Sequence, residues 1–428
     1  MDESLTSPPP GLLKLPAELL YQVFDDVYMN WSEVAPTSRK SSRPPTSPLS
    51  RALVDYQRQG LYRVVTLKTR KNSVRFFKSI LAQPRLASLV TSLTLRIPGT
   101  SGRSNSNGTE VSPDEIETCF SSLVNLEALS LREYTAVHFP SLLSILTSNA
   151  LSSKCTSITL ALPGHRQDAL SSLPLNMTRC NLEVVGYQTA AIGKPEDAVS
   201  RPPFSSLSSL SLWTNQYHSD GFDLWRSFIA RCDSLRRICL HRFSQDDVLN
   251  YGILQSPSLQ SITELSFLGE PRYHLDLASI LPHFSNLLLL TLEVDCLDPF
   301  SHGFFDALRE LPLEILTFTG DGSASRSWWL DAPPVPSLPS LPSLEALISA
   351  PTQHLTLRTL KLDCVPSDPE TDTPLVDLSV DERVVPNLPR DYSIEGLKAL
   401  QLAGEKNGVV IEGSVFNLAE ELEACGLL

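Results

Sequence analysis

Apolar residues recur along most of the chain in one spacing, in which four apolar positions are separated by two, two and one residues. In the clearest copies, the third apolar position is Leu129, Leu210, Ile238, Leu265 or Leu290. In looser copies, that position is Leu93, Ile158, Val185, Leu316, Leu360 or Leu400. Because side chains alternate along a strand, the last two apolar residues face one way and the residue between them faces the other. Each copy therefore predicts a short strand with one buried face.

The strands are expected to alternate with helices. From Leu129 to Leu316, successive third apolar positions lie 25 to 29 residues apart, which leaves room for one helix in each interval. Ser112 and Glu115 have the spacing of a capping box, with a proline at the first helical position. Residues 222–229 and 304–308 repeat apolar side chains at helical spacing. Stacked units of one strand and one helix predict an α/β solenoid with strands on its concave face.

This period and the leucine pattern resemble the leucine-rich-repeat family over about residues 86–410. The resemblance implies a horseshoe-shaped solenoid, which we assign to residues 66–410, followed by a C-terminal capping helix in 411–428. The asparagine that the family places after each strand is clear only at Asn215. Irregular insertions are expected at 98–111, 331–343 and 364–392, where Gly, Ser, Pro or acidic residues interrupt the pattern.

Composition narrows the classes of function. The 428 residues include 72 leucines, and the 33 prolines argue against one long helical bundle. Residues 1–100 carry 14 basic and 7 acidic residues (+7), and the remainder carries 21 and 41 (−20), which sum to the net charge of −13. An acidic body disfavours nucleic-acid binding and favours a basic partner segment. No apolar run is long enough to span a membrane, so stable membrane insertion is not expected.

Residue clusters that carry catalysis were not found. The eight histidines and eight cysteines are scattered, without an HxxxH or CxxC pair, and no glycine-rich phosphate loop or GxSxG elbow occurs. We therefore expect no enzyme activity, no metal and no cofactor. The N-terminus lacks the features of a secretory signal, which favours reduced cysteines and a cytoplasmic or nuclear location.

Residues 15–27 form a separate pattern near the N-terminus. Pro16 fits the first helical position, and Leu15, Leu19, Val23 and Val27 lie four residues apart. Leu20 and Phe24 lie beside this row, which widens the apolar face. The pattern predicts an amphipathic helix.

The string LPxELLxxVF in this helix resembles the opening helix of the F-box, and residues 49–53 and 61–65 resemble its closing helix in many fungal F-box proteins. The resemblance covers residues 12–65, with a flexible insertion at 32–48 and a disordered tail at 1–11. It implies docking, as a monomer, on the S-phase-kinase-associated adaptor of an SCF-type cullin–RING ubiquitin ligase, with the repeats recruiting a protein substrate. The adaptor-facing positions would be Leu15, Pro16, Leu19, Leu20, Val23 and Phe24. The alternatives are that this helix only caps the solenoid, and that the chain is a leucine-rich scaffold without ligase function.

Residues between and just after the paired leucines are expected to point away from the core, toward a partner. The candidates for substrate binding are Arg132, Trp213, His241, Glu293, Lys361 and Asp363. Trp213 and His241 occupy equivalent positions in successive repeats, so they should be close neighbours. Trp213 is the expected anchor, because aromatic side chains dominate binding hot spots.

The last four residues, which begin at Cys425, match the prenylation pattern that ends in leucine. No basic residue occurs in 407–428, so a second membrane signal is missing. The alternative is a structural role for this end, since Val415, Phe416, Leu418, Ala419 and Leu422 predict an amphipathic helix that caps the last repeat.

Overall fold

The computed structural model describes residues 61–67, 70–96, 111–132, 154–163, 173, 175–185, 203–214, 222–241, 243, 248–249, 252–268, 276–293, 302–321, 338–349, 356–365 and 391–424. The chain divides into two compact units. Unit 1 comprises Met1–Ala161, Asp168–Met177 and Glu370–Thr373, and unit 2 comprises Leu162–Gln167, Thr178–Pro369 and Pro374–Leu428. Residues 12–60 of the expected F-box-like module, with its insertion at 32–48, and the tail at 1–11 lie outside the described residues, as do most of the three expected insertions. Of the segment expected to resemble the closing helix, residues 61–63 are helical, whereas residues 64 and 65 already belong to a strand.

Four parallel strands of unit 1 pair in chain order. They are β1 (Val64–Leu67), β2 (Ser92–Arg96), β3 (Ala128–Arg132) and β4 (Ser157–Pro163), of which the last two residues of β4 are assigned to unit 2. Their register aligns the third apolar positions Val65, Leu93, Leu129 and Ile158, and all four side chains are buried. The strand at Val64–Leu67 thus adds one repeat before the first one that the sequence pattern predicts.

The described part of unit 1 contains α3 (Arg70–Ala82), η3 (Pro84–Leu89) and α4 (Pro113–Ser122). Helix α3 buries Phe76, Phe77 and Ile80, and the Phe77 ring lies 6.0 Å from that of Phe120 on α4. The expected capping box is confirmed, because the Glu115 amide donates to Ser112 Oγ at 3.2 Å and the Ser112 amide donates to Glu115 Oε2 at 2.7 Å.

Eight parallel strands of unit 2 also follow one another in chain order. They are β5 (Arg179–Val185), β6 (Ser209–Thr214), β7 (Arg237–His241), β8 (Glu264–Leu268), β9 (Leu289–Glu293), β10 (Ile315–Asp321), β11 (Thr359–Val365) and β12 (Val410–Glu412). The buried row through Leu210, Ile238, Leu265, Leu290, Leu316 and Leu360 is in register, as the sequence pattern predicts.

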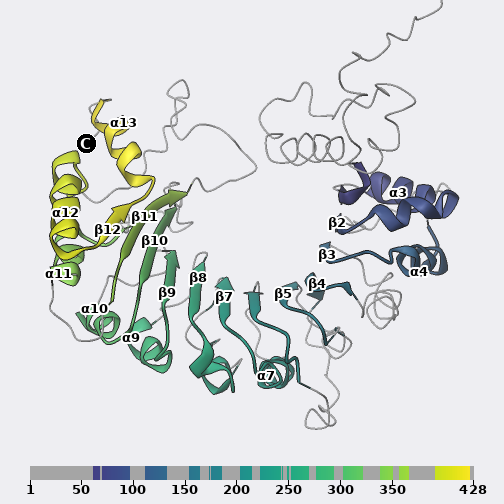
Figure 1. Cartoon of the computed structure of the whole chain (residues 1–428), viewed down its shortest axis with the longest axis horizontal. Helices are drawn as coiled ribbons and strands as arrows, with labels where there is room; N and C mark the ends of the chain where they lie inside the picture. The colour runs from purple at the N-terminus through teal and green to yellow at the C-terminus, as the bar shows by residue number, and fades with distance from the viewer. Residues whose placement is uncertain are drawn as a thin grey trace, which may run out of the picture. The chain divides into compact units, whose positions relative to one another are not determined.

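Helices cover one face of this sheet (Figure 1). They are α7 (Phe222–Ala230), η7 (Ile253–Gln255), η8 (Leu259–Ser261), α9 (Leu277–Ile280), η9 (Leu281–His283), α10 (His302–Arg309), α11 (Leu341–Ser349), α12 (Ile394–Asn407) and α13 (Val415–Ala424). The expected helices at 222–229 and 304–308 are confirmed by α7 and α10. The parallel register, with helices on one face, gives the leucine-rich α/β repeat fold that the sequence predicts.

Two sequence-based strand positions are wrong. Cys180, not Val185, pairs with Leu210 and holds the buried third apolar position of β5. Leu400 lies within helix α12, and the strand that pairs with β11 is β12, where Ile411 is the partner of Leu360. The two intervals around Cys180 are consequently uneven, at 22 residues from Ile158 and 30 residues to Leu210.

Polar side chains link each repeat to the one before it. The hydroxyls of Thr91, Ser208 and Thr263 each lie two residues before a buried third apolar position. Each donates to the carbonyl of the equivalent residue in the preceding repeat, at 3.1, 3.1 and 3.4 Å, respectively. Asn125 and Asn286, one residue before a buried leucine, donate to carbonyls of the preceding repeat at 2.7 and 2.6 Å. The three hydroxyls bond carbonyls that also accept a backbone amide of the following repeat, so they reinforce links that the backbone already makes at the strand entrances.

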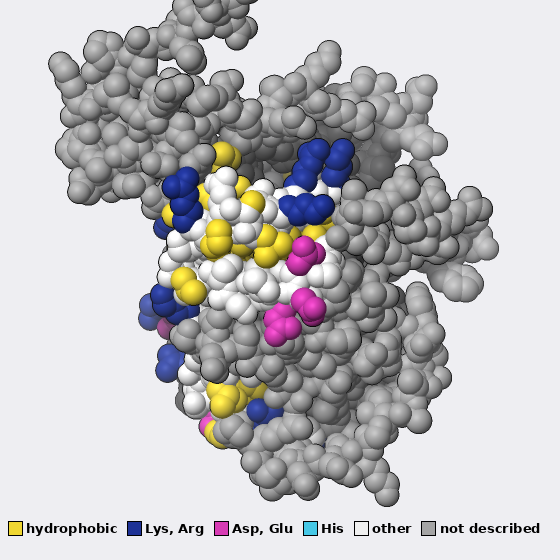
Figure 2. Space-filling view, turned by 90° about the vertical axis from the view of Figure 1, so that its right-hand side faces the viewer, with side chains coloured by type: hydrophobic (Ala, Val, Ile, Leu, Met, Phe, Trp, Pro, Cys, Tyr) yellow, Lys and Arg dark blue, Asp and Glu magenta, His cyan; other side chains and the backbone are white. Residues whose placement is uncertain are grey.

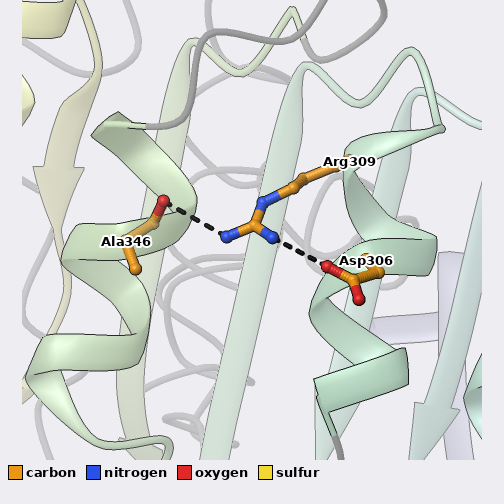
Figure 3. A network of polar contacts seen from close by, with 3 residues as sticks. All are labelled: Asp306, Arg309 and Ala346. Carbon is orange, nitrogen blue, oxygen red and sulfur yellow. Dashed lines mark hydrogen bonds and ion pairs between the residues drawn. The ribbon is translucent and has the colours of Figure 1, made fainter.

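On the helical side of unit 2, Arg309 bridges two helices (Figure 3). Its Nη1 donates to Asp306 Oδ1 at 2.8 Å within α10, and its Nη2 donates to the Ala346 carbonyl of α11 at 3.4 Å. The guanidinium therefore fixes one helix against the next.

The C-terminal end of unit 2 is closed by segments that pack across the last repeats. Asp391 Oδ2 accepts the Leu341 amide at 2.6 Å at the start of α11, and the buried Tyr392 hydroxyl donates to the Pro339 carbonyl at 2.8 Å. Helix α13 buries Val415 and Leu418, which confirms the amphipathic capping helix expected in 411–428. Cys425 lies outside the described residues, so its prenylation stays a prediction.

Candidate functional site

The face of the unit 2 sheet that points away from the helices is here called the strand face. Three rows of side chains run across it from strand to strand, because the parallel register aligns equivalent residues of each repeat. The first row precedes the buried third apolar position, the middle row lies between the two buried residues, and the last row follows them. Neighbouring strands lie about 4.8 Å apart, so each row is a closely spaced series.

The middle row carries mostly short polar side chains. From β5 to β10 it consists of Asn181, Ser211, Cys239, Ser266, Thr291 and Thr317. Their hydroxyl, thiol and amide groups can hydrogen-bond a polypeptide backbone. Because these side chains are short, few side-chain atoms project from the sheet along the middle row. A bound segment could therefore approach the sheet closely along this row.

Trp213 and His241 form an aromatic pair in the last row. Trp213 on β6 is in register with His241 on β7, and their rings stack with centroids 5.0 Å apart and an interplanar angle of 13°. Trp213 remains 37% exposed. The predicted proximity of these two residues is thus confirmed. Leu268 follows His241 in register on β8 and extends the pair as a half-buried apolar side chain.

A second apolar group lies in the first row, over the later strands. Leu289 on β9 pairs in register with Ile315 on β10, and both are half-buried. Val410, on the short strand β12, is 59% exposed. The strand face thus presents two apolar groups separated by the polar middle row.

Cys239 contacts His241, but it lacks the chemistry of an activated nucleophile. Its Sγ lies 3.2 Å from His241 Nε2. Burial raises the pKa of the Cys239 thiol to about 11, while a hydrogen bond with Ser211 and the charge of Arg237 lower it in part. Nucleophilic cysteines require a lowered pKa, because the thiolate is the reactive form. At neutral pH Cys239 is therefore a protonated thiol in contact with His241, the residue on which Trp213 stacks.

This assignment predicts slow alkylation of Cys239. A pKa near 11 leaves the thiol protonated at neutral pH, and the labelling rate should rise about tenfold per pH unit until the pH approaches the pKa. Iodoacetamide labelling, followed by mass spectrometry of the peptide that contains Cys239, measures this rate. The urea-unfolded chain is the control and should label more than about tenfold faster at pH 7. Equal rates in the folded and unfolded chain would contradict the assignment.

The charged residues of the strand face are largely paired with one another. Arg237 Nε lies 2.6 Å from Glu264 Oε2 between β7 and β8. Lys361 Nζ lies 2.7 Å from Glu412 Oε1 between β11 and β12. The hydrogen bond to Glu412 and its negative charge raise the pKa of Lys361, so the Lys361 ammonium is charged at neutral pH. Each of these four charges therefore lies beside a charge of the opposite sign.

Asp363 and Lys361 hold the C-terminal cap. Asp363 Oδ1 accepts the Ser414 amide at 2.9 Å, directly before α13. Together with the Lys361–Glu412 ion pair, this bond fastens β12 and α13 to β11. The sequence predicts that both residues bind a substrate. In the structure, each of them also contacts the C-terminal cap.

The other predicted site residues are distributed as follows. Glu293 ends β9, in register with Thr319 on β10, and so shares the last row with Asp363. Arg132 ends β3 in unit 1, and its side chain lies outside the described residues. The six adaptor-facing residues from Leu15 to Phe24 also lie outside them. The structure therefore brings together Trp213 and His241, and separately Lys361 and Asp363.

Within the described ranges, no group of three or more His, Cys, Asp or Glu side chains is arranged to hold a metal ion. In the same part of the chain, no helix has the length and apolar character needed to cross a bilayer.

No protein-family model and no curated protein matches the chain. Among solved structures, the complex of Rad7 and Elc1 from yeast is similar at 13% identity and a TM-score of 0.39, over 92% of this chain and 87% of the other. The leucine-rich-repeat-containing protein LegL7 from Legionella pneumophila is similar at 17% identity and a TM-score of 0.38, over 78% of this chain and 97% of the other. At TM-scores below 0.5, neither likeness bears on function. The residues of the chain itself establish a leucine-rich α/β repeat fold.

Proposed function

We propose that this chain is the substrate-recognition subunit of an SCF-type cullin–RING ubiquitin ligase. Its N-terminal helix would bind the S-phase-kinase-associated adaptor through Leu15, Pro16, Leu19, Leu20, Val23 and Phe24. The strand face of unit 2 would bind a protein substrate. The sequence LPxELLxxVF supports the first part, and the stacked Trp213–His241 pair beside the polar middle row supports the second.

The main observation in support of substrate binding is that Trp213 is 37% exposed and that its ring stacks on His241. Large aromatic side chains supply binding energy at little conformational cost when their orientation is already fixed. The second apolar group, at Leu289 and Ile315, begins two strands beyond His241, about 10 Å across the sheet, and lies four residues, about 13 Å, nearer the N-terminal ends of the strands. An extended polypeptide advances about 3.4 Å per residue, so a segment of about five residues could contact both groups. This separation favours a protein segment as the ligand.

The test is co-purification of partners with the tagged full chain from its native cells while proteasome activity is blocked. The proposal expects the adaptor and a cullin among the partners, together with substrates stabilised by the block. The alternative function, a leucine-rich interaction scaffold without a ligase link, is favoured by the strand face alone. It predicts partners that bind the repeats, with neither the adaptor nor a cullin.

Replacing Trp213 should weaken substrate capture. In Trp213→Ala, loss of the ring should lower the recovery of repeat-bound partners about tenfold, because a central aromatic anchor is removed. The melting temperature should change little, since the ring is 37% exposed. Affinity measurement with a recovered partner, alongside a thermal melt, checks both points.

Trp213→Phe is the matched control and should keep much of the binding, because it retains an aromatic ring against His241. Undiminished capture by Trp213→Ala would remove Trp213 from the binding surface. A large fall in melting temperature would instead assign the ring a structural role.

A further inference from the structure

Unit 1 contains an unusual run of positive charge. Residues 56–109 include ten Lys and Arg and not one Asp or Glu. This run opposes the sign of the chain as a whole, whose net charge is −13. A run of one sign over more than fifty residues lacks the local partners that usually neutralise surface charge.

Helix α3 collects part of this charge on one face. Lys71, Arg75 and Lys78 are exposed at spacings of four and three residues, which places them on the same side of the helix. The opposite side is buried through Ser73, Phe76, Phe77 and Ile80. Packing therefore fixes which side faces solvent. The three basic residues are here called the basic stripe, and they span about 10 Å at 1.5 Å per residue.

Within the described part of the chain, no acidic side chain forms an ion pair with Lys71, Arg75 or Lys78. Arg85, on the adjoining η3, is also exposed and extends the positive surface beyond the end of α3. The charge of the basic stripe is thus available to an external anion.

The neighbouring helix limits the width of this surface. Helix α4 packs against α3 and exposes Asp114, Glu115 and Glu117. On the face shown in Figure 2, a group of Lys and Arg side chains lies above a separate group of Asp and Glu side chains. A broad anionic surface, such as a duplex or a bilayer, would bring phosphates against those carboxylates. A narrow ligand can follow α3 alone.

The composition of α3 also argues against a phosphate-rich ligand. The exposed residues of its outer face are Lys71, Asn72, Arg75, Lys78 and Ala82, without an aromatic ring to stack on a base or a large apolar side chain to enter a membrane. Phe76 and Phe77 are buried in the core. From these observations we propose that the basic stripe of unit 1 binds an acidic polypeptide segment of a partner protein, independently of the strand face of unit 2.

The test measures binding of the full chain to a fluorescent peptide of about eight alternating Glu and Ser residues, a length that covers the stripe. The same peptide with Gln in place of Glu is the ligand control. Lys71→Gln/Arg75→Gln/Lys78→Gln should weaken binding to the acidic peptide about tenfold at low salt, because three exposed charge contacts are lost. Raising the salt from about 50 to 300 mM should weaken the wild-type chain similarly.

Two variants control this experiment. Arg236→Gln/Lys398→Gln/Lys406→Gln removes the same charge from exposed positions of unit 2 and should bind the peptide within about twofold of wild type. Lys71→Arg/Lys78→Arg keeps the charge on the stripe and should also bind normally. Equal weakening by the unit 2 variant would overturn the proposal, because the effect would then follow net charge.

Two further probes test the occupant. A short DNA duplex and vesicles that contain phosphatidylserine are offered under the same conditions. The proposal expects both to bind more weakly than the acidic peptide. Stripe-dependent binding of either probe in preference to the peptide would overturn it, as would unchanged peptide binding by the triple variant with an unaltered melting curve.

Discussion

The chain carrying Leu15→Ala and Phe24→Ala should lose the adaptor while its repeats stay folded. Truncation of a central apolar anchor costs about 2 kcal/mol or more, so the two together should cost on the order of 4 kcal/mol if their effects add. That loss corresponds to a weakening of about a thousandfold. Co-purification of the adaptor with wild-type and doubly substituted chain measures it, and a thermal melt of each shows whether the repeats are intact.

Asp25→Ala provides the matched control for this helix. On a helical projection, Asp25 lies on the side opposite Val23 and Val27, so it is not among the residues expected to face the adaptor. This variant should retain the adaptor. If the double variant also retained the adaptor, this helix would not be the adaptor-binding surface, and the F-box assignment would be wrong. If the wild-type chain recovered no adaptor, the ligase role itself would be excluded, while the strand face kept its function.

The sequence pattern located strands reliably where leucine or isoleucine filled the buried positions. It failed at β5 because the buried third position there is Cys180, a small apolar residue that a leucine pattern overlooks. It failed at Leu400 because the spacing of Leu397 and Leu400 suits a helix as well as the first half of a repeat. Short apolar spacings alone do not distinguish these two cases.

The candidate site was predictable only where it depends on local alternation. Trp213 and His241 follow equivalent buried pairs, so parallel register places them side by side. The contacts of Lys361 and Asp363 were not predictable, because their partners Glu412 and Ser414 lie 51 residues further along the chain in each case. Strand β12 has three residues, too few to show a repeating pattern.

The same reasoning explains why the polar links between repeats were missed. The leucine-rich-repeat pattern places an asparagine after each strand, whereas Asn125 and Asn286 lie before the strands and donate to carbonyls of the preceding repeat. Serine and threonine at strand entrances act similarly. Serine, threonine and asparagine are common in loops. Only their constant distance in sequence from the next buried apolar residue indicates that they link one repeat to the preceding one.

Gly413→Ala should be strongly destabilising at the C-terminal end of unit 2. Gly413 has a φ of 138°, a conformation that residues with a side chain rarely adopt. A Cβ at this position would fall on the backbone carbonyl of Leu362 in β11. The strain and the clash together should cost about 3 kcal/mol, because neither strand backbone can move without breaking the ladder.

The position of Gly413 determines which contacts the substitution would break. It lies between Glu412, which pairs with Lys361, and Ser414, whose amide donates to Asp363. Displacing the backbone at Gly413 would therefore break both links between the cap and β11. Because each repeat contacts mainly its neighbours, the loss should appear as local opening at 391–424. Hydrogen exchange, resolved by peptide, measures that opening.

Gly408→Ala is the matched control, since it makes the same substitution a few residues earlier. Gly408 ends α12 with a φ of 74°, and no atom lies within 4 Å of the added Cβ. Only the cost of the left-handed backbone remains, about 1 kcal/mol. Much faster exchange in Gly413→Ala than in Gly408→Ala is the expected result. Equal exchange would mean that contact with Leu362 does not hold the cap, and that Lys361 and Asp363 are available to a partner.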